Sequence, residues 1–303
     1  MEAVRDSVER VIIGKREAVE LALIALVAEG HVLVEDVPGT GKSTLARALS
    51  KSLDVSFKRV QCTSDLLPSD VLGLSVYSRS TEQFEFRPGP IFSQVLLADE
   101  LNRTSPRTQS AFLECMQERR VSIEGETREL ERPFFVIATQ NPSLFEGTYP
   151  LPESELDRFL LSFALGYPDR TSELAVLDRF GGDDPTDALE PVANAKQLLH
   201  AIEAARGVHV DESIKNYILD VVDATRTSDW FELGASTRGS LAWVRAARAK
   251  AVLRGRDFVT PDDVIELAFP VLVHRLVTKN PADDRARVQA ALEQVLDGIE
   301  APR

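Results

Sequence analysis

Residues 31–44 read HVLVEDVPGTGKST, and this stretch decides the fold. Its first five residues are mostly apolar, as in a buried strand, and a helical pattern begins at Lys42 and runs to residue 53. Between strand and helix lies a turn that contains Gly39 and Gly41. Glycine lets the backbone curl so that its N–H groups point inward, and the N-terminus of the helix adds partial positive charge. The pattern is therefore typical of a loop that binds phosphate groups.

The side chains of this loop suit a nucleotide with a metal ion. Lys42 can reach the outer phosphates, and the Ser43 hydroxyl can ligate Mg²⁺. The usual pattern begins with glycine where this chain has Asp36, so the alternative is a glycine turn that merely starts a helix. The strand before the loop and the helix after it favour ATP binding. We predict that the nucleotide contacts Asp36, Val37, Pro38, Gly39, Thr40, Gly41, Lys42, Ser43 and Thr44.

A second apolar run, VLLADE at residues 95–100, ends in two acids. A carboxylate at a strand tip beside a phosphate loop can hold Mg²⁺ through water, which suits Asp99. The next carboxylate, Glu100, can polarise an attacking water, which favours hydrolysis over transfer to an organic acceptor. The alternative is a strand that happens to end in acids.

A third apolar run, at residues 134–139, leads to Asn141. The Asn141 amide could orient the attacking water or contact the γ-phosphate. Asparagine followed by proline is also an ordinary start of a turn, so this position alone indicates little.

The wider pattern predicts an α/β fold. Helical stretches at residues 42–53 and 105–119 alternate with short runs that are apolar on both faces, as in a parallel sheet covered by helices. Two stretches, at about residues 74–91 and 119–132, interrupt this alternation and are interpreted as insertions, the second as a hairpin. The five predicted strands are residues 31–35, 56–61, 95–99, 134–139 and 159–163.

A composition change marks the predicted domain boundary. Residues 181–185 read GGDDP, a turn-rich acidic stretch, and the pattern after it indicates helices only. We therefore predict a nucleotide-binding core at residues 1–183 and an all-helical lid domain at residues 190–303.

Composition excludes some classes of protein. The chain has 35 basic and 48 acidic residues, a net charge of −13, which argues against a general nucleic-acid or membrane-surface binder. The longest nearly apolar run, residues 18–28, is too short to cross a bilayer, and the charged N-terminus resembles no signal peptide. We therefore predict a cytoplasmic protein without membrane insertion, in which Cys62 and Cys115 are buried free thiols.

Six stretches carry a resemblance that covers nearly the whole chain. They are EDVPG at 35–39, DLLPSD at 65–70, FRPGPIF at 86–92, DELNR at 99–103, ATQNP at 138–142 and EGTYPLPE at 146–153. With them the chain resembles the MoxR family of AAA+ ATPases, in the branch with an insertion in helix 2 and a hairpin before the first sensor. Asp36 matches that family's phosphate loop. The resemblance implies an αβα sandwich with a five-stranded parallel sheet, followed by a helical lid.

The resemblance also implies roles for residues outside the phosphate loop. Arg158, in the stretch LDRF, resembles an arginine finger that reaches a neighbouring subunit's ATP. Arg238, in the stretch GASTR, resembles the second sensor on the lid, although the family often has proline where this chain has Thr237. Ile13 and Gly14 would lie against the adenine. Without the resemblance both arginines would be taken for surface residues.

The sequence does not decide the roles of three polar residues. Gln61 ends the second predicted strand, where related ATPases keep a polar residue that restrains the catalytic glutamate. Asn102 and Arg103 follow the two acids directly and could contact the nucleotide or a neighbouring subunit, or form a surface salt bridge.

The expected function is that of a chaperone-like ATPase that hydrolyses MgATP to remodel or mature partner proteins. An arginine supplied by a neighbour requires a head-to-tail ring, and a hexamer is the family expectation. The family also implies a client with a von Willebrand factor A domain, and work such as metal insertion or complex assembly.

Two other functions stay open. One is a nucleic-acid motor, although the second insertion is near neutral and nucleic acid is not an expected partner. The other is a scaffold that binds nucleotide without hydrolysing it.

Overall fold

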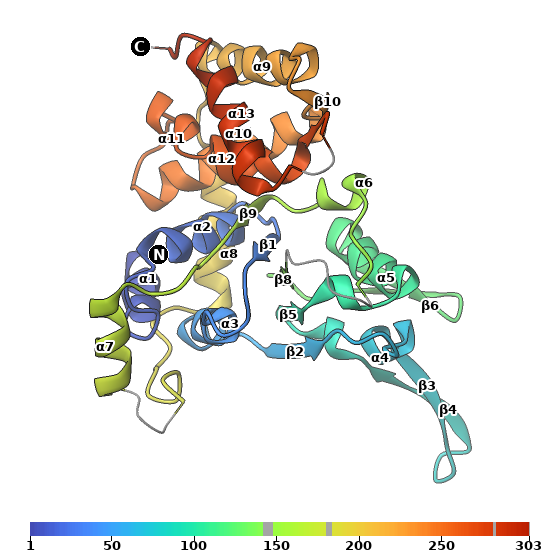
Figure 1. The fold of residues 1–303 in the computed structure, drawn as a ribbon. Helices are drawn as coiled ribbons and strands as arrows, with labels where there is room; N and C mark the ends of the chain where they lie inside the picture. The colour runs from blue at the N-terminus through green and yellow to red at the C-terminus, as the bar shows by residue number, and fades with distance from the viewer. Residues whose placement is uncertain (142–147, 180–183, 281–282, 303) are drawn as a thin grey trace. The chain divides into compact units, whose positions relative to one another are not determined.

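The computed structural model describes residues 1–141, 148–179, 184–280 and 283–302 (Figure 1). These residues form two compact units. The first unit comprises Met1–Glu20, His31–Pro152 and Ala164–Leu199, and the second comprises Leu21–Gly30, Glu153–Phe163 and His200–Arg303.

The first unit contains the α/β alternation that the sequence predicted. Its strands are β1 (Val32–Glu35), β2 (Phe57–Gln61), β3 (Gly73–Ser78), β4 (Gln83–Pro88), β5 (Val95–Asp99), β6 (Arg120–Ile123), β7 (Glu126–Glu129) and β8 (Phe135–Gln140). Its helices are α1 (Glu2–Glu9), α3 (Lys42–Ser52), α4 (Pro68–Leu72), η1 (Pro90–Phe92), η2 (Leu101–Arg103), α5 (Pro106–Glu118) and α7 (Arg170–Arg179). Two helices have residues in both units, α2 (Arg16–Val27) and α8 (Ala195–Gly207).

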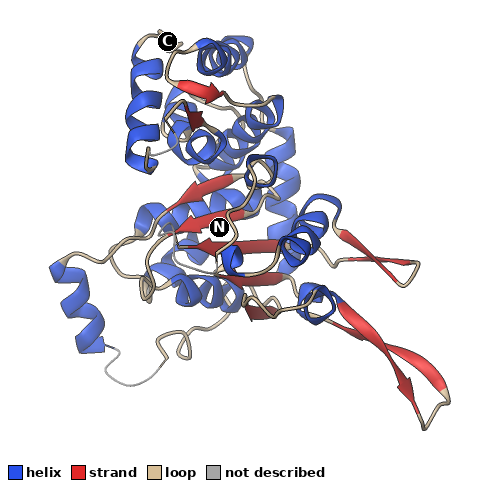
Figure 2. Ribbon diagram, turned by 45° about the vertical axis from the view of Figure 1, so that its right-hand side comes forward, coloured by secondary structure: helices blue, strands red, loops and turns tan. Residues whose placement is uncertain are grey.

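The central sheet has five strands in the order β2-β5-β8-β1-β9, where β9 is Leu161–Phe163. The predicted five-stranded parallel sheet is confirmed, and Figure 2 shows helices on both of its faces. All five residues of β5 are buried, because this strand lies inside the sheet and both of its faces are covered. In the register of the sheet Gln61 lies beside Asp99, and Glu35 lies beside Gln140. Polar residues at the carboxyl ends of neighbouring strands thus meet at one edge.

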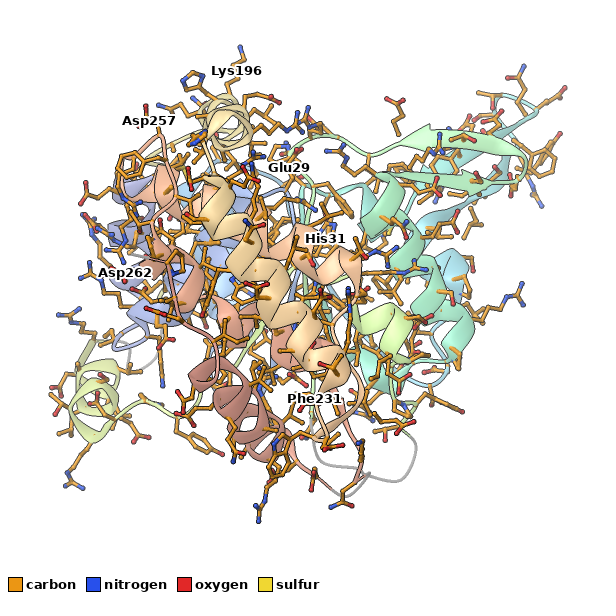
Figure 3. The ribbon with its side chains drawn as sticks, turned by 90° about the horizontal axis from the view of Figure 1, so that it is seen from above. Glu29, His31, Lys196, Phe231, Asp257 and Asp262 are labelled. Carbon is orange, nitrogen blue, oxygen red and sulfur yellow. The ribbon has the colours of Figure 1, made fainter. Side chains whose placement is uncertain are left out.

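His31 fixes the start of β1 (labelled in Figure 3). The side chain is buried, and its Nδ1 accepts a hydrogen bond from the Val136 N–H at 3.0 Å. Nδ1 is therefore unprotonated in the neutral ring, and Nε2 donates to the Met116 carbonyl at 2.9 Å. These bonds connect β1 to β8 and to α5.

Two hairpins extend from the first unit (Figure 2). β3 pairs with β4 and β6 pairs with β7, both antiparallel. The turn between β6 and β7 contains Glu124 and Gly125, both with positive φ, as a two-residue hairpin turn of the primed type requires. The hairpin predicted at about residues 119–132 is thus present.

The C-terminal part of the second unit, from residue 200 onward, is mostly helical, as expected for a lid. Trp243 is fully buried at its centre, and its ring N–H donates to the Val264 carbonyl at 2.9 Å. The prediction of helices only missed one feature. β10 (Phe231–Leu233) and β11 (Val277–Thr278) form a short antiparallel pair that contains the buried Phe231 (labelled in Figure 3). Besides β9, the elements are α6 (Glu153–Leu156), α9 (Glu212–Thr227), β10 (Phe231–Leu233), α10 (Thr237–Leu253), α11 (Pro261–Ile265), α12 (Ala268–Leu272), η3 (Val273–Arg275), β11 (Val277–Thr278) and α13 (Arg285–Asp297).

Several predicted features lie outside the described residues. The domain boundary at residue 183 is one of them, so the division into 1–183 and 190–303 stays a prediction. Pro142, Glu146 and Gly147 of the family-like stretches are others. In the parts of the chain that the structure describes, no helix combines the length and the apolarity that crossing a bilayer requires.

Candidate nucleotide site

The phosphate loop joins the end of β1 to the start of α3. Gly39 has φ +85° and Gly41 has φ +95°, backbone conformations that glycine adopts at little cost. Gly41 is the N-cap of α3 and has no side chain, so the first N–H groups of the helix have no side-chain cap. A helix start of this kind is suited to an anion.

Lys42 bridges the two ends of its own loop. Its ammonium group donates to the carbonyl oxygens of Asp36 at 3.0 Å and of Val37 at 2.8 Å. The charge is therefore held over the loop, close to where the outer phosphates of a nucleotide would bind.

Asp36 explains the departure from glycine at the first position of the loop. The residue is buried, and its Oδ1 accepts the N–H of Val37 at 2.8 Å. Its Oδ2 accepts the N–H groups of Leu165 at 2.9 Å and of Gly166 at 2.8 Å. A carboxylate that accepts three backbone N–H groups fastens the loop to a distant segment of the first unit. The sequence predicted Asp36 as a nucleotide contact but not this structural role.

Asp99 ends β5 and is almost fully buried. Its Oδ1 accepts the Thr139 hydroxyl at 2.7 Å, and its Oδ2 accepts Nη2 of Arg59 at 2.6 Å and Nε at 3.1 Å. Sequence reasoning missed both Thr139 and Arg59. Arg59 stands two residues before Gln61 in β2, so the alternation of the strand could have placed it on the same face.

Glu100 follows Asp99 in a left-handed backbone conformation, with φ +58° and ψ +50°. This conformation costs a non-glycine residue roughly 1–2 kcal/mol, and contacts on both sides of the residue hold it. The Glu100 N–H donates to the Thr139 hydroxyl at 2.8 Å, and the Glu100 carbonyl accepts the Arg103 N–H at 2.8 Å. The carboxylate accepts Nε2 of Gln61 at 3.2 Å and Nη1 of Arg103 at 2.7 Å.

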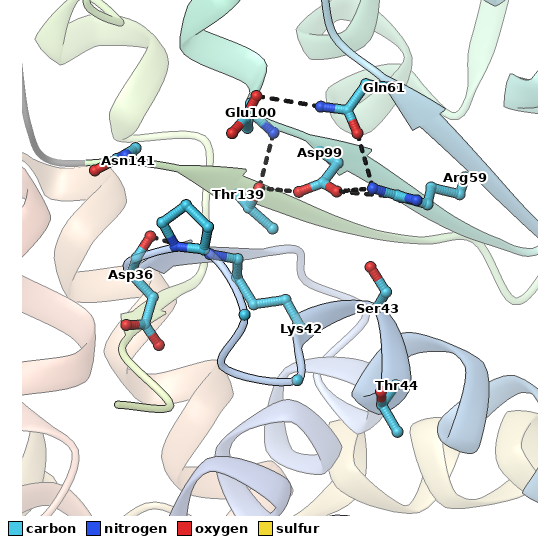
Figure 4. Close-up of a pocket in the computed structure, with 13 residues that line it drawn as sticks. Asp36, Lys42, Ser43, Thr44, Arg59, Gln61, Asp99, Glu100, Thr139 and Asn141 are labelled. Atoms are coloured by element: carbon cyan, nitrogen blue, oxygen red, sulfur yellow. Dashed lines mark hydrogen bonds and ion pairs between the residues drawn. The ribbon is translucent and has the colours of Figure 1, made fainter. Parts of the chain in front are cut away.

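These groups line one pocket of about 410 Å³ (Figure 4), a volume typical of a small-molecule site. Thirteen residues line it: Asp36, Pro38, Gly39, Gly41, Lys42, Ser43, Thr44, Arg59, Gln61, Asp99, Glu100, Thr139 and Asn141. The pocket thus brings the phosphate loop and the two acids together at the carboxyl edge of the sheet, where open α/β sheets bind ligands. The oxygen donors of Ser43 and Asp99 suit Mg²⁺, and Lys42 with the start of α3 suits phosphate.

Four predicted contact residues are not among the thirteen, namely Ile13, Gly14, Val37 and Thr40. Thr40 turns its hydroxyl toward the Val37 carbonyl at 3.4 Å, inside the loop. Gly14 has φ +75°, and a Cβ there would lie 2.2 Å from the Ser172 hydroxyl, so glycine is required for packing; Ile13 beside it is half-buried. Asn102, for which a nucleotide contact was one interpretation, donates to the Asn141 carbonyl at 3.2 Å.

Cys62 follows Gln61 and is buried beneath the acids, as predicted for a free thiol. Burial, together with the negative charges of Asp99 and Glu100, raises the pKa of the Cys62 thiol to about 12. The thiol is therefore neutral and chemically inert at ordinary pH.

Arg158 and Arg238 belong to the second unit. Arg158 follows α6, and its neighbour Asp157 accepts Nε of Arg275 at 2.8 Å and the Ser236 hydroxyl at 2.8 Å. Arg238 lies on the first turn of α10, with Nη1 at 3.9 Å from the Asp157 carboxylate. Burial lowers the pKa of Arg275 to about 10, although the negative charge of Asp157 acts in the opposite direction and raises it. Asp157 thus connects the predicted finger segment to the predicted second sensor within this unit.

Comparison with known proteins defines the class of the fold and site. Residues 31–161 match the ATPase family associated with various cellular activities (AAA), and residues 223–295 match the AAA lid domain. A crystal structure from Cytophaga hutchinsonii, provisionally described as an ATPase, has a TM-score of 0.91 and 36% identity. That similarity covers 100% of this chain and 94% of the other. The chain therefore has the core and lid of an AAA ATPase.

Two relatives narrow the class to a family. Uncharacterized protein YeaC of Bacillus subtilis is 47% identical, over 98% of this chain and 93% of the relative. Chaperone MoxR1 of Mycobacterium tuberculosis is 40% identical, over 98% of this chain and 81% of the relative. The chain belongs to the MoxR family of AAA+ ATPases, and membership implies nucleotide binding.

Proposed function

We propose that the protein binds ATP with Mg²⁺ in this pocket, hydrolyses it, and uses the energy to remodel or mature partner proteins. The observation that carries the proposal is the placement of Asp99 and Glu100 in the same pocket as Lys42 and Ser43 (Figure 4). This set combines groups that hold phosphate and metal with a carboxylate that can activate water.

Each group has one role in the proposal. The loop N–H groups and Lys42 bind the phosphates, while Ser43 and Asp99 would hold Mg²⁺. Mg²⁺, when bound, neutralises charge on the phosphates and orients them. Glu100 orients and polarises the attacking water, and Asn141 at the end of β8 assists by contacting the water or the γ-phosphate.

We propose that four residues outside the pocket complete the nucleotide site when subunits assemble into an oligomer. We propose that Ile13 and Gly14 lie against the adenine, and that Arg238 contacts the γ-phosphate. Arg158 is assigned to the ATP of a neighbouring subunit, where it stabilises charge in the transition state. This arrangement requires a ring, and we propose a hexamer.

The two hairpins are proposed as the surface that contacts the client. Tyr77 and Phe84 of the β3–β4 hairpin are 51% and 74% exposed, with ring centroids 5.5 Å apart. Exposed paired aromatic residues are typical of protein-binding surfaces. A partner with a von Willebrand factor A domain, and work in metal insertion or complex assembly, are the client and task that we assign to this surface.

The test of the proposed function is the rate of ATP hydrolysis by wild type and Glu100→Gln. We expect a loss of about 100-fold or more in the variant, with binding of a fluorescent ATP analogue retained, because the change removes the base and keeps the shape. The control is Glu114→Gln, which removes an exposed glutamate of α5 that does not line the pocket. Equal rates in Glu100→Gln and wild type would contradict the proposal, and binding without turnover in wild type would favour a scaffold.

A further inference from the structure

Arg59 pairs with the carboxylate that is proposed to hold Mg²⁺. Its guanidinium lies with Nη2 at 2.6 Å and Nε at 3.1 Å from Oδ2 of Asp99. The Arg59 side chain is 46% exposed, whereas that of Asp99 is 12% exposed. The arginine therefore has space to move, while the aspartate is fixed.

The same guanidinium is connected to the proposed catalytic glutamate. Arg59 Nη2 donates to Oε1 of Gln61 at 2.8 Å, and Nε2 of Gln61 donates to Oε2 of Glu100 at 3.2 Å (Figure 4). Arg59 and Gln61 project from the same face of β2, because side chains two apart in a strand share a face. Asp99, Arg59, Gln61 and Glu100 thus form one continuous chain of hydrogen bonds along the pocket.

A metal ion held by Asp99 would compete with Arg59. Oδ2 accepts two hydrogen bonds from Arg59, and Oδ1 accepts one from Thr139, so the oxygen that faces Arg59 has no lone pair left for a metal ion or its water. A divalent cation and a guanidinium on one carboxylate would also repel each other strongly at such short distance. We therefore expect Arg59 to leave Asp99 when a metal ion enters.

We propose that Arg59 is a positioning residue that acts as a tethered substitute for Mg²⁺. It neutralises Asp99 while no metal is bound, and it leaves Asp99 when Mg²⁺ enters with the nucleotide. Because Gln61 is bonded to both Arg59 and Glu100, the departure of Arg59 changes the bonds that hold Glu100. The inference rests on the proposed function, since it concerns MgATP at this site.

From the charge of Arg59 we can predict how the affinity for nucleotide depends on the presence of Mg²⁺. In wild type without Mg²⁺ the arginine compensates for Asp99, so the triphosphate still meets a pocket with balanced charge. Without Arg59 the triphosphate meets the uncompensated carboxylate of Asp99, while Glu100 keeps its ion pair with Arg103. Mg²⁺ then has to relieve the repulsion between Asp99 and the phosphates. Loss of the arginine charge should therefore weaken metal-free binding selectively.

The experiment measures the affinity of a fluorescent ATP analogue in EDTA and in excess Mg²⁺, and the quantity compared is the ratio of the two dissociation constants. For Arg59→Gln we expect this ratio to rise roughly tenfold over wild type, a size that suits one lost ion pair at a partly buried site. Arg59→Lys keeps the charge and should stay within about twofold of wild type. Lys58→Gln removes a charge from the neighbouring position on the opposite face of β2, and should leave the ratio unchanged.

An unchanged ratio in Arg59→Gln, with normal thermal unfolding, would overturn the inference. Arg59→Met serves as a second neutral variant, since the exposed side chain leaves no cavity when it is replaced, and an unchanged ratio there would overturn it equally. If wild type failed to bind the analogue even with Mg²⁺, the proposed function itself would fail, which distinguishes the two outcomes.

Discussion

Thr139 is the residue on which both acids of the pocket depend. Its buried hydroxyl donates to Asp99 at 2.7 Å and accepts the Glu100 N–H at 2.8 Å. One side chain from β8 thus orients the proposed metal ligand and holds the unusual backbone of the proposed base.

Replacing Thr139 by valine should damage both stability and turnover. Valine keeps the shape but leaves a buried carboxylate oxygen and a backbone N–H without their partner, which costs about 1–3 kcal/mol. The free energy of unfolding in urea and the ATPase rate should both fall. Thr139→Ser keeps the hydroxyl and serves as the control, and wild-type values for Thr139→Val would contradict the assigned role.

Asp36→Ala should destabilise the first unit even without nucleotide. Three backbone N–H groups lose a charged acceptor, so a loss of about 2–4 kcal/mol in the free energy of unfolding is expected. Asp6→Ala, at an exposed position of α1, is the control and should change stability little. A ligand-free Asp36→Ala protein as stable as wild type would show that the residue acts only on nucleotide.

Cys62 should make stability depend on alkaline pH. Its pKa is raised to about 12, so the folded state keeps the thiol protonated while the unfolded chain loses that proton from about pH 9. The folded state then binds more protons, and stability that is complete below pH 9 is lost as pH rises toward 12. Urea unfolding at pH 8, 9 and 10 should show a shallower decline for Cys62→Ala than for wild type. Parallel pH profiles would contradict this.

The local sequence pattern was enough to predict those site residues that act together with their neighbours in the sequence. The phosphate loop is an example, because its glycines and Lys42 act within one turn of chain. Arg59 and Thr139 could not be found in the same way, since each matters only through a partner on another strand. Their pairing with Asp99 comes from the order of strands in the sheet, which the sequence does not state.

The two hairpins act as coupled elements of the first unit. The Arg128 guanidinium of β7 lies 3.9 Å from the centre of the Phe86 ring of β4. The Ser75 hydroxyl of β3 donates to the Glu124 carboxylate at 2.5 Å. A client that moves one hairpin would therefore disturb the other.

Hydrogen exchange can test this coupling. Phe86→Ala removes the ring beneath Arg128 and should speed amide exchange in residues 120–129, because the cation–π contact is worth about 0.5–1 kcal/mol at an exposed site. Phe84→Ala removes a ring of the same hairpin that pairs with Tyr77 instead, and should leave residues 120–129 unchanged. Equal exchange in both variants would contradict the coupling.

The positions of helices and strands were predicted correctly from the sequence where these elements are long or buried. β5 was predicted at residues 95–99 and is Val95–Asp99, because a run apolar on both faces permits few alternatives. β10 and β11 were missed, since strands of three and two residues carry no readable period.

In the proposed function the whole molecule works as one subunit of a ring. Its net charge of −13 suits a protein that works on other proteins rather than on nucleic acid. Arg158 has its Nε buried, and Asp157 beside it joins α6 to α10 in the second unit. If Arg158 serves a neighbour's ATP, activity belongs to the ring and not to the single chain.

The most direct measurement is the ATPase rate of a one-to-one mixture of Arg158→Ala and Glu100→Gln, compared with each variant alone. Each variant alone should be nearly inactive, and the mixture should recover activity, because some interfaces then combine an intact Glu100 with an intact Arg158 from the neighbour. Wild-type specific activity should also rise with protein concentration as rings form. A wild-type rate independent of concentration, together with an unaffected Arg158→Ala, would contradict hydrolysis between subunits.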